Sequence, residues 1–123
     1  MARYFRKIKA WQLADRLAVE VYGSTKAFPK DEIYGLRSQI RRAAVSVPTN
    51  IVEGSARQHK REYLNFLYIA KGSLAEVDYL FHLANQLGYI GENTYHKMQD
   101  LIDNASKTLA GLIKSVEKEA NNK

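Results

Sequence analysis

Apolar residues recur at helical spacing through four long segments of this chain, and this periodicity constrains its fold more than any other feature. Residues three and four positions apart lie on one face of an α-helix, so each segment would carry an apolar stripe along one side. The segments cover residues 9–26, 33–58, 60–87 and 93–118. The sequence shows no alternating strand pattern and no internal repeat, so the fold it predicts is all-α.

Short connections between these segments favour an antiparallel up-down-up-down four-helix bundle. A length of 123 residues suits a single domain spanning the whole chain. We expect residues 1–8 to form a basic N-terminal tail and residues 119–123 to be frayed. The topology places the start of the first helix beside the joint between the second and the third.

Pro48 falls inside the second segment. Proline lacks the N–H that a helix interior needs, so it breaks or kinks a helix. Because the apolar pattern resumes in register at Ile51, we predict one helix kinked at Pro48 rather than two helices.

Positive charge is concentrated in the first half of the chain. Residues 1–61 carry 13 Lys and Arg against 5 Asp and Glu, whereas residues 62–123 carry 6 against 8. Such asymmetry predicts an acidic partner such as nucleic acid, although a solvated basic face that only confers solubility explains the charge as well. The predicted topology gathers a first cluster of candidate phosphate-binding residues at one end of the bundle: Arg3, Arg6, Lys7, Arg57, Lys60 and Arg61. A second cluster would lie towards the opposite end: Arg37, Arg41 and Arg42.

No pattern in the sequence predicts catalysis. The chain has no cysteine, and its three histidines lie on different segments without the spacing of a helical metal site. A phosphate-binding glycine loop, a nucleophile elbow and a catalytic triad are all missing from the sequence. We therefore expect a protein that is not an enzyme and binds no metal or cofactor. No segment approaches the roughly 20 apolar residues of a membrane span, so we expect a cytoplasmic protein.

Two apolar stripes exceed what one bundle core needs. The apolar arc of the second segment covers about 200°, and the third segment carries an additional stripe through Leu64, Tyr68, Ala75 and Tyr79. Either the second helix is central in a tightly packed bundle, or these surfaces meet another subunit. We expect a homo-oligomer whose interface includes five residues: Val45, Val52, Leu64, Tyr68 and Tyr79.

Several stretches resemble a known family along most of the chain. They are Phe28-Pro29, residues 32–44, residues 47–54, residues 66–76 and Leu87-Gly88-Tyr89. Together they resemble the bacterial four-helix bundle family of rRNA intervening-sequence or ribosomal-protein-like proteins. The resemblance implies RNA binding, since founding members are encoded inside intervening sequences of large-subunit rRNA genes. It implies no enzymatic activity.

Relatives of that family include the accessory variability determinants of diversity-generating retroelements. These form pentameric barrels that work with a reverse transcriptase and nucleic acid. The resemblance therefore implies a homopentamer whose partners are RNA or DNA and a protein such as a reverse transcriptase. Arg37 and Arg41 match the family motif but fall within the apolar arc, where they would instead support a subunit interface.

The sequence thus predicts a non-catalytic, oligomeric helical bundle that acts as an RNA-binding accessory or adaptor. The alternative is a structural scaffold that binds another protein without nucleic acid. The two differ in their response to salt, because contacts with phosphate weaken as salt rises and apolar contacts do not.

Overall fold

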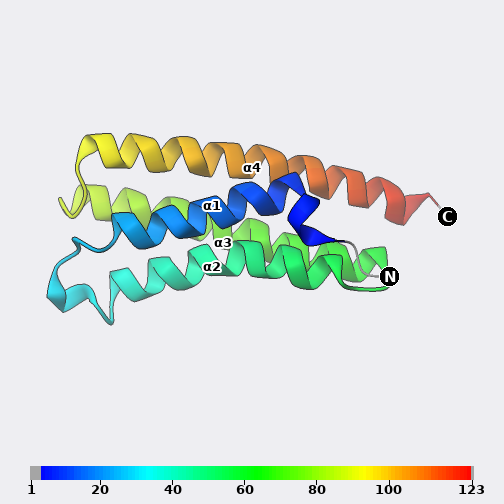
Figure 1. Cartoon of the computed structure of the whole chain (residues 1–123), viewed down its shortest axis with the longest axis horizontal. Coiled ribbons are helices and arrows are strands. Elements are labelled where there is room, and N and C mark those ends of the chain that lie inside the picture. Colours follow the sequence, from blue (N-terminus) through cyan, green and yellow to red (C-terminus); the bar gives the residue numbers. More distant parts are fainter. Residues whose placement is uncertain (1–3, 123) are drawn as a thin grey trace.

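The computed structural model describes residues 4–122, and four antiparallel helices make up most of them. The helices are α1 (Lys9–Ser24), α2 (Leu36–Ser55), α3 (Lys60–Gln86) and α4 (Glu92–Asn121), and two short 3₁₀ helices, η1 (Phe5–Lys7) and η2 (Lys30–Glu32), precede α1 and α2. Successive helices run in opposite directions, and the start of α1, the α2–α3 joint and the end of α4 lie at one end (Figure 1). The described residues contain no strand, and the predicted all-α four-helix bundle is confirmed.

Within residues 4–122, helix extends further towards both ends than the sequence predicted. Part of the expected basic tail forms η1, and Ile8 behind it is buried. α4 continues to Asn121, past the predicted end at residue 118, because Val116 and Ala120 are buried and hold its last turns against the bundle. The structure thus shows helix from residue 119 to Asn121, where the sequence predicted a frayed end.

α2 begins three residues later than predicted, at Leu36, because the chain first makes the 3₁₀ turn η2 after Pro29. The Glu32 carboxylate accepts a hydrogen bond of 2.9 Å from the backbone N–H of Leu36, one of the donors that the first turn of a helix leaves unpaired. The other carboxylate oxygen of Glu32 accepts a 2.8 Å bond from the Tyr89 hydroxyl in the α3–α4 connection. One side chain thus starts α2 and ties two connections together.

The wide apolar arc of α2 is almost entirely used inside the bundle. Its buried apolar members are Leu36, Ile40, Ala43, Ala44, Val47 and Ile51. Of the rest, Val45 is 39% exposed and Val52 is half-buried. Of the two alternatives that the sequence left open, the structure thus supports the one in which α2 is a central helix of a tightly packed bundle.

α2 passes through Pro48 without a break, as predicted, and the kink itself stays a prediction. Side chains next to the proline bond back to the preceding turn. Thr49 Oγ1 donates to the carbonyl of Val45 at 2.7 Å, and Asn50 Nδ2 donates to the carbonyl of Ser46 at 2.8 Å. These bonds reinforce the turn in which the missing proline N–H leaves a carbonyl without its helical partner.

Two features fix α3 against its neighbours. The Ser46 and Ser73 hydroxyls are 2.8 Å apart between α2 and α3. At the other end of α3, Gly88 adopts a left-handed conformation (φ 76°), and the N–H of Tyr89 reaches back to the carbonyl of Ala84 at 2.9 Å. This glycine-dependent cap ends the helix and starts the turn into α4.

Within residues 4–122, no helix has the length and hydropathy needed to cross a bilayer.

Candidate nucleic-acid interface

The bundle brings most of the first basic cluster to one end. Arg6 and Lys7 lie on η1, which contacts both α1 and α2. Arg57 follows α2, and Lys60 and Arg61 open α3 at the same end of the molecule (Figure 1). Arg3, which the sequence also assigned to this cluster, lies outside the described residues.

Aromatic rings anchor η1 and orient Arg6. The Phe5 ring meets the Trp11 ring of α1 edge-on, with centroids 4.9 Å apart. The Arg6 guanidinium carbon lies 4.7 Å from the centroid of the Phe5 ring, within the range of a cation–π contact. The same guanidinium carbon lies 5.9 Å from the centroid of the Tyr4 ring, whose residue is 55% exposed. This short segment therefore presents a positive group and an exposed aromatic ring together.

The remaining basic residues of this end differ in how far they are already engaged. The Arg57 guanidinium carbon lies 4.7 Å from the Phe66 ring centroid, which holds the side chain against α3. Lys60 Nζ lies 3.4 Å from a carboxylate oxygen of Glu119 on α4, so its charge is partly neutralised. Lys7 and Arg61 are exposed and form no ion pair within residues 4–122. The contribution of Glu119 was missed because the sequence predicted a frayed end there.

A shallow cavity of about 350 Å³ opens at this end between the start of α3 and the end of α4. It is lined by His59, Lys60, Arg61 and Ala120. Basic side chains outnumber acidic ones over the surrounding helix ends. The basic residues are Arg6, Lys7, Lys9, Arg57, Lys60, Arg61, Lys114 and Lys118; the acidic residues are Glu53, Glu62, Glu117 and Glu119.

In the second cluster, Arg41 also has a structural role. Its Nε donates to the Thr25 hydroxyl at 2.8 Å, and a terminal nitrogen donates to the Tyr22 carbonyl at 3.1 Å. Its guanidinium also stacks on the Tyr22 ring, 4.5 Å from the centroid. Arg41 therefore caps the C-terminal turn of α1, where helix carbonyls lack partners. Its roles in phosphate binding and at a subunit interface stay predictions.

The other two arginines of that cluster remain at the surface of α2. Arg42 is exposed and lines a cavity of about 370 Å³ together with Arg41, Tyr22 and Asn50. Arg37 is half-buried near the start of the helix. Arg41 and Arg42 thus share one cavity, and anion binding there stays a prediction.

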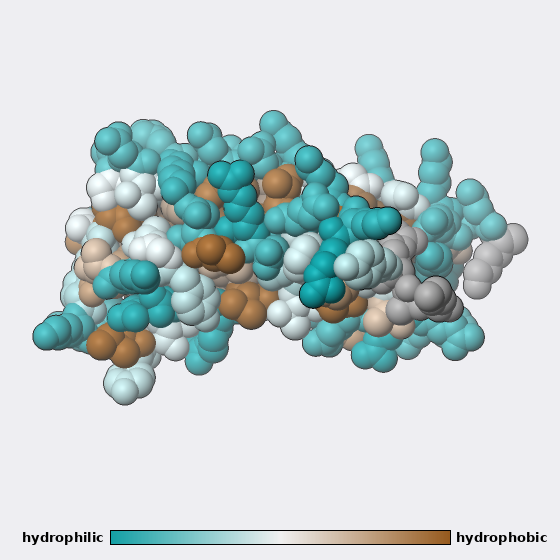
Figure 2. Space-filling view, in the orientation of Figure 1, coloured by the Kyte–Doolittle hydropathy of each residue, from teal (hydrophilic) through white to brown (hydrophobic). Residues whose placement is uncertain are grey.

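The predicted interface residues divide into buried and exposed members. Leu64 is only 8% exposed and belongs to the core, because the first turns of α3 pack into the bundle; its predicted place on an exposed stripe is wrong. Tyr68 and Tyr79 are 45% and 59% exposed on α3. Figure 2 shows a largely hydrophilic face, with hydrophobic surface confined to small separate patches.

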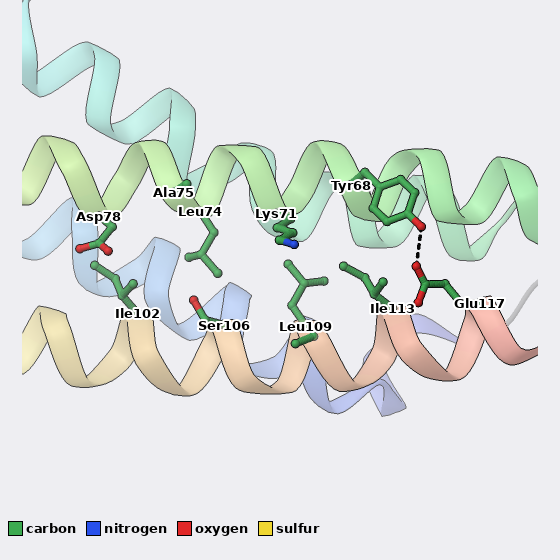
Figure 3. Close-up of a pocket in the computed structure, with 11 residues that line it drawn as sticks. Tyr68, Lys71, Leu74, Ala75, Asp78, Ile102, Ser106, Leu109, Ile113 and Glu117 are labelled. Carbon is green, nitrogen blue, oxygen red and sulfur yellow. Dashed lines mark hydrogen bonds between the residues drawn. The ribbon is translucent and has the colours of Figure 1, made fainter.

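A groove of about 520 Å³ runs between α3 and α4. Leu74, Ile102, Leu109 and Ile113 project into it from the two helices (Figure 3). At one end the Tyr68 hydroxyl donates to Glu117 at 2.6 Å, and this bond to a carboxylate raises the pKa of Tyr68. At the other end Asp78 accepts a 3.1 Å bond from Gln99. These polar groups pair with each other across the rim instead of converging on one point.

No arrangement for metal binding occurs in the part of the chain that the structure describes: residues 4–122 contain no group of three or more His, Asp or Glu residues placed to share an ion. Of the histidines, His96 lies 3.6 Å from Glu92 on the exposed face of α4. The surface features that remain as candidates for function are thus the basic end, the cavity that Arg41 and Arg42 share, and the faces of α3.

Comparisons with known proteins identify the family. A sequence model described as 23S rRNA-intervening sequence protein matches residues 6–111. Among solved structures, a protein of unknown function from the S23 ribosomal protein family of Bacteroides thetaiotaomicron VPI-5482 has a TM-score of 0.78 and 23% sequence identity. The alignment covers 85% of this chain and 95% of that chain, and at this identity it shows a shared fold. No curated protein matches the sequence at the significance we required. The chain belongs to the 23S rRNA-intervening sequence protein family.

Proposed function

We propose that this protein binds RNA through its basic end, as a non-catalytic accessory or adaptor. The observation that carries the proposal is the concentration of exposed positive charge around η1 and the start of α3, together with the exposed ring of Tyr4, which Arg6 contacts. The description of the family refers to the intervening sequences of 23S rRNA, which agrees with a nucleic-acid partner.

The two kinds of group at this end suit unpaired RNA. Lys7 and Arg61 carry charges that phosphates can neutralise, with release of counterions. Tyr4 offers a ring on which an unstacked base can lie, and protein contacts to single-stranded or looped RNA commonly combine such stacking with backbone phosphate contacts. A looped RNA should therefore bind more tightly than a duplex of the same length.

The test is the salt dependence of RNA affinity, measured by fluorescence anisotropy with a short labelled stem-loop. The variant replaces Arg6, Lys7 and Arg61 with Gln. The matched control replaces three exposed basic residues outside this end, Lys26, Lys30 and Lys107, with Gln and so removes the same charge.

If each of the three basic-end residues contacts one phosphate, the slope of log K against log salt becomes shallower by about 2, at roughly 0.7 per contact with single-stranded nucleic acid. The control should retain most of the slope. Equal losses in both triple variants would mean that only net charge matters, and the proposal of a site at the basic end would then be wrong.

A second candidate function is a scaffold that binds another protein without nucleic acid. The α3–α4 groove favours it: buried Leu109 and Ile113 form its apolar floor, exposed Tyr68 lies at its rim, and partner helices bind in apolar grooves. This function predicts contacts that are insensitive to salt and no retention of the stem-loop RNA.

Self-association is part of both proposals. Tyr68 and Tyr79 are large side chains left exposed on one helix, and interfaces are enriched in such aromatic residues. Light scattering measures the number of copies, for which the resemblance implies five. A particle of the 14.0 kDa chain mass at micromolar concentration would contradict self-association.

A further inference from the structure

The first turns of α2 carry positive charge that no carboxylate of that helix balances. Arg37 and Arg41 are one turn apart, and like charges at this spacing destabilise a helix. Arg42 adds a third charge beside them. Glu53 is the acidic residue of α2, and it follows Arg42 by about 16 Å along the axis. Glu76 of α3 bonds Gln39 at 3.4 Å and forms no ion pair with these arginines within residues 4–122.

Arg41 and Arg42 line one cavity of about 370 Å³, a volume in the range of small-ligand sites. No acidic residue is among those that line it. Thr49 and Asn50, which also line it, donate to carbonyls of the preceding turn of α2. The two guanidinium groups are therefore the charged donors that a ligand in this cavity would meet.

The fold holds the Arg41 guanidinium in place without a ligand. Its bonds to the buried Thr25 hydroxyl and to the Tyr22 carbonyl use two of the five N–H groups of a guanidinium, and the Tyr22 ring packs against it. Further N–H groups thus remain for an anion, on a side chain that loses little additional freedom when it binds. Arg42 is exposed and forms no hydrogen bond or ion pair within residues 4–122.

We propose that Arg41 and Arg42 together bind the terminal phosphate of a phosphorylated ligand, either a free nucleotide or the phosphorylated end of an RNA. A terminal phosphate carries close to two negative charges at neutral pH, which two guanidinium groups balance, and guanidinium groups bond phosphate oxygens in pairs. Arg41 precedes the end of α2 at Ser55 by about 21 Å along the axis. The site is therefore separate from the basic end and does not rest on RNA binding there.

Two pairs of matched probes test for recognition of a terminal phosphate by the full chain. AMP and cyclic AMP share base and ribose, but only AMP has a terminal phosphate. A short single-stranded RNA is likewise compared with a 5′-phosphate and with a 5′-hydroxyl. By isothermal titration calorimetry we expect the terminal phosphate to raise affinity at least about tenfold in one pair. Preference for AMP identifies a free nucleotide as the ligand, and preference in the RNA pair alone identifies an RNA end. Equal affinities within both pairs would overturn the proposal.

Substitutions locate the site through the ratio of the two affinities in the responsive pair. Arg42→Gln should remove most of the preference, whereas Arg61→Gln, which removes the same charge at the basic end, should retain it even where it weakens RNA binding overall. Thr25→Val removes the acceptor that positions Arg41 and keeps the net charge, so it should lower the ratio, and Thr25→Ser should restore it. Thermal unfolding checks that each variant is folded. A preference that survives Arg42→Gln, or that Arg61→Gln removes, would place the phosphate elsewhere and refute the site.

Discussion

Gly54 lies where α2 crosses α3, and its replacement by alanine tests whether that crossing sets the spacing of the two helices. An added Cβ would lie 2.8 Å from Phe66 Cβ, 2.9 Å from Tyr63 Cδ1 and 3.2 Å from the Tyr63 carbonyl oxygen. Carbon atoms in contact prefer separations of about 3.5–4.0 Å. A Cβ and a backbone oxygen are fixed to α3, so the methyl group fits only if the helices move apart.

Two opposing effects determine the size of the change. Alanine favours a helix interior over glycine by about 1 kcal/mol. Insertion of a methyl group into a packed crossing costs about 1–3 kcal/mol. Because the contacts at Gly54 involve rigid atoms, we expect the upper part of that range and a net loss of about 1–2 kcal/mol. For a chain of this length, about 4 °C of Tm corresponds to each kcal/mol.

The assay is thermal and urea unfolding followed by circular dichroism, with Gly111→Ala on α4 as the matched control. A Cβ at Gly111 meets nothing within 4 Å, so that substitution carries only the helical gain and should raise the Tm. We expect Gly54→Ala to lower the Tm by about 4–8 °C. If both substitutions stabilise the protein equally, the close crossing at Gly54 does not constrain the bundle, and the reasoning is refuted.

Two further predictions concern the connections between helices. The hydrogen bonds from the Leu36 N–H and the Tyr89 hydroxyl lower the folded-state pKa of Glu32 below 4.5. The Glu32 carboxylate therefore stabilises the folded state fully above that pH, and this stabilisation is lost as pH falls through the lowered pKa. The Tm difference between wild type and Glu32→Gln should accordingly shrink in an acid titration, and a constant difference would contradict this. Gly88→Ala should cost about 1–2 kcal/mol in urea unfolding, because only glycine adopts its positive φ without strain, and a neutral effect would show that the turn does not need it.

The bundle could be predicted because its information is local. Apolar residues at helical spacing mark each helix, and short connections leave few ways to pack four of them. The position of the basic end followed from topology alone, since antiparallel order places η1 beside Arg57 and Arg61. The number, order and direction of the helices, which could be predicted from such local patterns, agree with the structure.

The sequence did not reveal contacts between residues that lie far apart along the chain. Arg41 binds the end of α1 through Thr25, sixteen positions earlier, and nothing near Arg41 distinguishes it from an exposed arginine. Glu119 likewise pairs with Lys60 from the far end of the chain. Leu64 was assigned to an exposed stripe because it lies on nearly the same side of the helix as Tyr68. The side of α3 that is buried nevertheless changes along its length, because the elements packed against it begin and end at different points.

Residues that carry the family resemblance stabilise the fold of this chain. Glu32 starts α2 and holds Tyr89, Gly54 permits the α2–α3 crossing, Ser73 bonds across it, and Gly88 ends α3. Matching such positions specifies the frame of the bundle, and it constrains the exposed surface much less. Relatives with this frame can therefore differ in what they bind. The proposed function of this chain depends on groups that this frame does not require, namely the charges and the exposed Tyr4 ring around η1. A substitution at that surface should change binding while leaving the unfolding transition nearly unchanged, whereas a substitution in the frame should do the reverse.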